Sequence, residues 1–217
     1  MLHLSQTLFF IEIIIFATVI FMHLSKKSSS VVVLYALQSL SVTVLLLASA
    51  LEEANLALLA VTILIFAAKV IVAPYFFLKL LKKNQLKFSV SSYLNTPLTL
   101  IVLTILTIMT HANFFKPIAV IAPANGSALL MAIAIILISI FLIINRRGAL
   151  SQMIGILSLE NAIVSFAFFA GLEQTPGLEL GVTFDIITWI VIATVFVSMI
   201  HKQFGSLDVT SMKHLTE

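Results

Sequence analysis

The sequence contains no cysteine and very few charged residues. Of its 217 residues, 10% are charged and 61% are hydrophobic, whereas soluble domains carry charge on about a quarter of their residues. The lack of cysteine excludes disulfides, thiol nucleophiles, and cysteine-ligated zinc or iron–sulfur clusters, so any such group would have to lie on another polypeptide. The low charge excludes an ordinary soluble enzyme domain and indicates an integral membrane protein.

Seven apolar stretches follow one another along the chain, and a helix needs about 20 such residues to cross a bilayer. They lie near residues 4–23, 31–51, 56–78, 97–112, 118–144, 149–171 and 180–201. The first lacks the basic start of a cleavable signal peptide, so we expect it to be retained. The fifth contains the turn signal Asn125-Gly126, and we expect its helix to begin near Ser127. The sequence therefore predicts an all-α bundle of about seven transmembrane helices.

The basic residues fall into alternate connections between these stretches. Ten of the twelve share one predicted side: Lys26, Lys27, Lys79, Lys82, Lys83, Lys87, Arg146, Arg147, Lys202 and Lys213. The opposite connections are mainly acidic, with Glu52, Glu53, Glu173 and Glu179. The positive-inside rule then predicts an outside N-terminus and a cytoplasmic C-terminus. This clustering also accounts for the pI of about 9.3 without nucleic-acid binding.

We expect one transmembrane domain over residues 1–217. It divides into helices one to three (1–95), helices four and five (96–145), helices six and seven (146–203) and a cytoplasmic tail (204–217).

Four ionisable residues lie within the predicted spans: Glu12, Lys69, Glu160 and Asp185. Placing a charge at the centre of a bilayer costs on the order of 3 kcal/mol or more, so such residues often mark a partner, a water cavity or a proton path. We expect these four to take part in proton transfer. Polar side chains from the same spans and the last acidic connection would support them: Gln38, Ser158, Asn161, Glu179 and Thr188.

Each of these residues also has a structural interpretation. Glu160 could simply form a hydrogen bond with a neighbouring helix, and Lys69 could neutralise a carboxylate in a fixed ion pair. Asp185 could reach water at the interface, and Glu12 could contact another subunit. The sequence does not show which of these side chains lie next to one another.

No cluster of serine, histidine and an acid indicates a covalent enzyme site. His23, His111 and His201 lie near the ends of predicted helices, where interfacial anchoring is a better interpretation than haem ligation. We therefore expect no catalytic residue, no metal and no cofactor in this chain.

Five segments of the chain form a recognisable set: residues 34–40, 69–74, 155–161, 178–181 with Asp185, and 205–209. Together they make the chain resemble the component E membrane subunit of hydrogenase-4 and formate hydrogenlyase-type complexes, which is related to the NuoK and MrpC subunits of complex I and multisubunit cation/proton antiporters. The stretch from about residue 84 to 145 adds little beyond hydrophobicity.

The resemblance implies an accessory subunit, not an enzyme, of a redox-linked ion-translocating complex in a bacterial or archaeal inner membrane. Its partners would be larger antiporter-like subunits, with or without a peripheral hydrogenase arm. In NuoK-like chains an intramembrane Glu follows a helix Gly by two positions and an Asn by six. Here Gly155 and Asn161 keep this spacing, but position 157 is Leu and the carboxylate is Glu160. The shift of three residues is close to one helical turn, so the carboxylate stays on about the same face.

Two other functions stay open at this point. A stand-alone small transporter would need a substrate-sized polar cavity and broken helices. A purely structural scaffold would satisfy its buried ionisable residues with fixed partners.

Overall fold

The computed structural model describes residues 2–83 and 91–172 and single positions between 175 and 199. Helices make up nearly all of the two continuous ranges. They are α1 (Leu2–Leu24), α2 (Ser28–Glu52), α3 (Leu56–Ile65), the π-helix η1 (Phe66–Val72), α4 (Ala73–Lys83), α5 (Thr96–Thr110), α6 (Lys116–Ala119), the 3-10 turn η2 (Pro123–Asn125), α7 (Gly126–Asn145) and α8 (Ala149–Phe169). The prediction of an all-α protein is confirmed for these residues.

Within the described part of the chain, five helical segments are long and apolar enough to cross a membrane. They are Thr7–Leu24, Ser28–Glu52, Leu56–Lys82, Pro123–Asn145 and Ala149–Phe169. The predicted fourth span corresponds to α5, which has 15 residues and is about 22 Å long, shorter than a hydrocarbon core of about 30 Å. The seventh apolar stretch lies largely outside the described residues. The count of seven spans therefore stays a prediction.

The start of the fifth span agrees with its turn signals. A 3-10 turn over Pro123–Asn125 precedes α7, which begins at Gly126. This confirms the expected irregular start and places the first helical residue next to Ser127.

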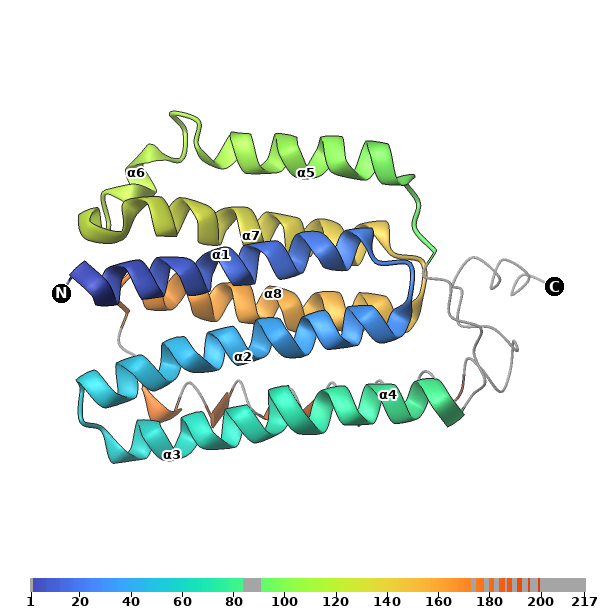
Figure 1. Ribbon diagram of the computed structural model, residues 1–217, viewed down its shortest axis with the longest axis horizontal. Helices are drawn as coiled ribbons and strands as arrows, with labels where there is room; N and C mark the ends of the chain where they lie inside the picture. The colour runs from blue at the N-terminus through green and yellow to red at the C-terminus, as the bar shows by residue number, and fades with distance from the viewer. Residues whose placement is uncertain are drawn as a thin grey trace.

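The bundle has four central helices and two outer rods. In Figure 1, α1, α2, α7 and α8 form the middle, α5 lies along one side, and α3, η1 and α4 form one continuous rod along the other. Of the central helices, α8 contacts both α7 and α2, and α2 also contacts η1. The fold thereby brings η1 and α8 to neighbouring sides of α2.

Gly155 allows α7 and α8 to approach closely. A Cβ atom built on Gly155 would lie 2.8 Å from Cγ1 of Ile143 and 3.3 Å from its backbone nitrogen. Helices in a membrane gain little from the hydrophobic effect when they associate, and they rely on close packing through small residues and on polar contacts. Gly155 supplies a small residue for close packing between α7 and α8.

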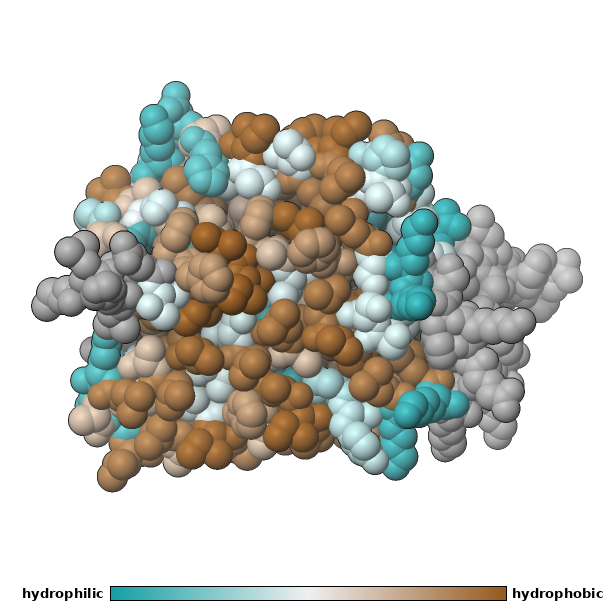
Figure 2. All heavy atoms as spheres, viewed as in Figure 1, coloured by the Kyte–Doolittle hydropathy of each residue, from teal (hydrophilic) through white to brown (hydrophobic). Residues whose placement is uncertain are grey.

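The two ends of the bundle differ in charge. The turns after α1 and α7 lie at one end in Figure 1 and hold Lys26, Lys27 and Arg147, whereas the end of α2 lies at the other, with Glu52 as its last residue and Glu53 in the turn that follows. Hydrophobic residues cover most of the face shown in Figure 2, and hydrophilic residues gather toward its two ends. This distribution is typical of a multi-pass membrane protein.

Candidate functional site: a buried Lys–Glu pair

Lys69 lies on the one π-helical segment in the described part of the chain. The segment spans Phe66–Val72 in the middle of the long rod, and the side chain of Lys69 is 1% exposed. Pro74 lies two residues after Val72, the end of this segment, and has no N–H group, so it cannot donate the bond that an α-helix would make to the carbonyl of residue 70. At this point the N–H of Ala73 donates to the carbonyl of Ala68, five residues back. π-helical turns of this kind are frequently found at functional sites.

Lys69 forms an ion pair with Glu160. Its Nζ atom lies 3.0 Å from Oε1 of Glu160 on α8, whose side chain is 19% exposed. Lys69 also donates a hydrogen bond of 3.0 Å to Oδ1 of Asn161. Both partners lie near the middle of their membrane-spanning segments. The sequence placed these two ionisable residues within spans, and the structure shows that they meet.

Asn161 connects this pair to α2. Its Nδ2 atom donates to Oγ of Ser39 at 2.9 Å and approaches Oε1 of Gln38 at 3.4 Å. Gln38, Ser39 and Asn161 are all fully buried. The amide thus receives a hydrogen bond from Lys69 with its oxygen and donates with its nitrogen, which links η1, α2 and α8 through one side chain.

Further polar groups line the same interfaces. The hydroxyls of Ser139 on α7 and Ser158 on α8 lie 3.2 Å apart. Within the described ranges, Nε2 of Gln38 and Oγ of Ser165 are buried without a hydrogen-bond partner. Buried polar atoms of this kind are usual places for ordered water. Asn161 and Gln38 thus lie beside the Lys69–Glu160 pair, whereas Ser158 lies at the interface of α7 and α8.

Glu12 is buried apart from this pair. Its side chain on α1 is 0% exposed, and both carboxylate oxygens lack a hydrogen-bond partner among the described residues. The interpretation of Glu12 as a surface contact for another subunit is wrong, because the bundle itself encloses this side chain. An isolated buried carboxyl requires either protonation or a partner that is not a described residue, since an unpaired charge is costly in this environment.

Asp185 and Thr188 lie outside the buried cluster. Both are exposed and helical, and Thr188 donates a hydrogen bond of 3.0 Å to the carbonyl of Phe184 on its own segment. Neither makes a hydrogen bond to Lys69 or Glu160 in the part of the chain that is described. Glu179, the remaining supporting residue predicted from the sequence, lies outside the described residues.

Arg146 has a second role that the charge pattern did not reveal. Its side chain is 2% exposed and folds back onto the end of α1. One guanidinium nitrogen donates to the carbonyl of Met22, to that of His23 at 2.9 Å and to that of Ser25 at 3.2 Å. Burial lowers the pKa of Arg146 to about 10, so it is protonated at neutral pH. This cation satisfies the carbonyls that a helix leaves unpaired at its C-terminus.

His23 is a core residue and not an interfacial anchor. It is 6% exposed, its Nε2 atom lies 3.0 Å from the carbonyl oxygen of Ile138, and its ring stacks on Phe141 at 5.0 Å between centroids. The prediction from its position near a helix end was wrong because α7 packs against the end of α1, and Ile138 and Phe141 of α7 contact the ring. No group of three or more histidine or acidic side chains in the described ranges is placed to hold a metal ion.

Comparison with known proteins gives one relative at low identity. Uncharacterized protein Rv0085 of Mycobacterium tuberculosis is 25% identical over 190 residues, which cover 87% of this chain and 86% of that protein. No family model and no solved structure matches the chain. The similarity extends over most of both chains, and it assigns no activity to either.

Proposed function

We propose that this chain is a non-catalytic subunit of a redox-linked, ion-translocating membrane complex, in which Lys69 and Glu160 take part in proton transfer. The observation that carries the proposal is the ion pair itself: Nζ of Lys69 lies 3.0 Å from Glu160 near the middle of two spans. Intramembrane ionisable residues are rare, and paired ones commonly belong to ion pathways and proton relays.

The surroundings of the pair support this role. Glu160 retains 19% exposure while Lys69 has 1%, so the carboxylate is the member of the pair that water or a neighbouring subunit can reach. A carboxyl relays protons when its pKa can cross the ambient pH, and movement of a nearby charge is one way to shift it. Lys69 supplies such a charge, and the π-helical turn gives its backbone an arrangement that differs from an ordinary α-helix.

We also propose that the chain belongs to a multisubunit complex and has the transmembrane topology predicted from its sequence. The chain would have about seven spans, with the N-terminus outside and the C-terminus in the cytoplasm of a bacterial or archaeal cell. Its partners would be larger antiporter-like subunits, as the resemblance to hydrogenase-4 component E implies. Glu12 on α1 and Asp185 on the last apolar stretch would be additional proton-transfer residues.

The decisive experiment replaces Glu160 with glutamine. Glu160→Gln keeps the size of the side chain and an oxygen that can accept from Lys69, but it removes the titrating proton. The chain and all co-purifying subunits are reconstituted into sealed vesicles, and proton uptake or release is measured during turnover. We expect normal assembly and a loss of coupled proton movement of at least about tenfold.

Glu52→Gln is the matched control, because Glu52 is an exposed carboxylate at the end of α2. It should assemble and move protons like the unmodified chain. Full proton movement in Glu160→Gln would leave the ion pair with a structural role only. Purification of the native chain without any other polypeptide would instead contradict membership of a complex.

A stand-alone transporter receives less support from the geometry. The cavity of about 520 Å³ lined by described residues lies between the end of α1 and the start of α2. It lies beside neither Lys69 nor Glu160, and four of its seven lining residues are apolar. A substrate path would be expected nearer the bilayer midplane.

A further inference from the structure

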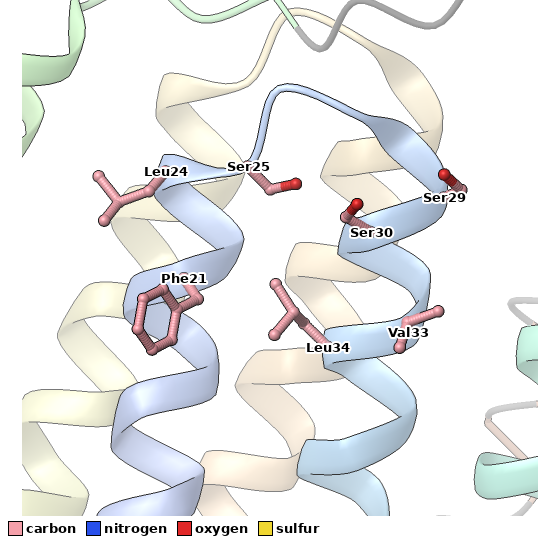
Figure 3. A pocket seen from close by; sticks show the side chains of 7 residues that line it. All are labelled: Phe21, Leu24, Ser25, Ser29, Ser30, Val33 and Leu34. Atoms are coloured by element: carbon pink, nitrogen blue, oxygen red, sulfur yellow. The ribbon is translucent and has the colours of Figure 1, made fainter.

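A groove opens between α1 and α2 at the basic end of the bundle. It has a volume of about 520 Å³ and is lined by Phe21, Leu24, Ser25, Ser29, Ser30, Val33 and Leu34. In Figure 3, Leu24, Ser25, Ser29 and Ser30 lie toward the turn that joins the two helices, and Phe21, Val33 and Leu34 lie farther from it. Three of the four lining residues near the mouth are therefore serines, and the residues below are apolar.

The groove is at the level where a bilayer changes from headgroups to hydrocarbon. The first membrane-spanning segment ends at Leu24 and the second begins at Ser28. The three serines of the groove and Leu24 therefore lie at the polar boundary, and Phe21, Val33 and Leu34 lie about one to two turns inside it. This matches the order of a phospholipid, with its phosphate outside and its acyl chains inside.

The charge around the mouth is positive. Lys26 and Lys27 form the turn directly between Ser25 and the start of α2, and both are exposed. Lys27 is the N-cap residue of α2 and makes no capping hydrogen bond with its side chain, so the first N–H groups of this helix face the same end without a side-chain acceptor. Ser29 and Ser30 lie just after this turn and line the groove. Basic pockets between transmembrane helices are typical binding sites for anionic lipid headgroups.

We propose that this groove binds one anionic phospholipid, with its phosphate at Ser30 and the two lysines and one acyl chain along Phe21 and Leu34. The positive charge at the mouth of the groove and its apolar lining farther inside together favour this ligand. A free phosphate ion would leave the apolar half of the groove unused, and a zwitterionic lipid would gain little from the lysines. The inference is independent of the proposed role in proton transfer.

The test uses the full chain with any subunits that accompany it, purified in a mild detergent. Native mass spectrometry measures the binding of phosphatidylglycerol and of phosphatidylcholine with matched acyl chains. We expect one retained phosphatidylglycerol and a clear preference over phosphatidylcholine. The variant K26Q/K27Q should weaken phosphatidylglycerol binding by about thirtyfold, because each lysine near a membrane surface contributes about 1 kcal/mol.

A second variant tests the groove rather than the charge. Val33→Trp places a large ring at a lining position that is 59% exposed, so the helix bundle should be retained while the apolar part of the groove is filled. Binding of both lipids at this site should then be lost. The control is K79Q/K82Q, which removes two exposed lysines of α4 outside the groove lining, and which should bind phosphatidylglycerol normally.

Three results would overturn the inference. Equal binding of the two lipids to the unmodified chain would reduce the site to an apolar groove without headgroup recognition. An equal loss in K26Q/K27Q and K79Q/K82Q would indicate diffuse attraction to the basic end. Release of a co-purifying subunit from Val33→Trp, without loss of lipid, would show that a protein occupies the groove.

Discussion

A double-mutant cycle on Lys69 and Glu160 measures whether the two side chains are a charged pair. Lys69→Met removes the ammonium but keeps most of the apolar volume, and it leaves Glu160 in the bundle without the cation that lies 3.0 Å away. Removal of one partner from a buried ion pair typically costs 3 to 5 kcal/mol of unfolding free energy, or about 3 kcal/mol where the other partner keeps some access to water. The 19% exposure of Glu160 favours this lower value.

Glu160→Gln should cost less than Lys69→Met. The new amide oxygen can still accept from Lys69, and Asn161 continues to accept from the ammonium at 3.0 Å. We expect a loss of about 1 to 2 kcal/mol. The double variant K69M/E160Q has no buried charge at this place. Its loss of unfolding free energy should be little greater than that of Lys69→Met alone, or smaller. The coupling free energy should therefore be about 2 kcal/mol.

The free energy of unfolding can be measured by titrating the purified chain in mixed micelles with sodium dodecyl sulfate and following helix content by circular dichroism. Glu12→Gln is the matched control, because Glu12 is also a buried glutamate but makes no hydrogen bond within the described ranges. Combined with Lys69→Met it should give additive losses. If the losses of Lys69→Met and Glu160→Gln also add up to that of the double variant, within about 0.5 kcal/mol, the interpretation as a charged pair is refuted.

Two further predictions concern packing and use the same titration. Arg146→Gln should lower the free energy of unfolding by about 3 kcal/mol because the end of α1 loses a charged donor. Arg147→Gln removes the same charge from the same turn and should lower it by about 1 kcal/mol or less. Equal losses in the two variants would contradict the capping role of Arg146. Gly155→Ala should cost about 1 to 3 kcal/mol because its Cβ would lie 2.8 Å from an isoleucine side chain of α7. Gly148→Ala is its control, since that Cβ would meet only a hydroxyl at 3.9 Å, and similar losses in both would argue against a close helix contact at Gly155.

The long apolar helices were predictable from the sequence because they depend on local composition. A run of about 20 apolar residues has few alternatives to a helix in lipid, since its backbone groups must bond internally. The start of α7 was predictable for a similar reason, because Pro123 and the Asn125-Gly126 turn act on their own neighbourhood. The short α5 was harder to assign, since its apolar residues continue to 112 while the helix ends at Thr110.

The meeting of Lys69 with Glu160 was not predictable, because 91 positions separate them in the chain and their contact depends on how the helices pack. From the sequence one can read an ionisable residue type and a position along the span for each, which is information along one axis only. Arg146 and His23 show the same difficulty at the ends of helices. Each was assigned by its height in the membrane, whereas its direction, toward the interior of the bundle, is decided by the helices around it.

Asn161 shows why packing and proton transfer are hard to separate in this bundle. Its amide accepts from Lys69 and donates to Ser39, so the side chain that orients the ion pair also fastens α8 to α2. Helices in lipid depend on such polar contacts for association because burial of apolar surface contributes little there. A polar interior that holds the helices together is therefore also the place where water and protons can be accommodated. A loss of proton movement in any variant of this cluster is therefore informative about mechanism only when assembly is measured on the same sample. Glu160→Gln preserves the shape of the side chain and a hydrogen-bond acceptor. It therefore separates packing from proton transfer better than a truncation of Asn161 would.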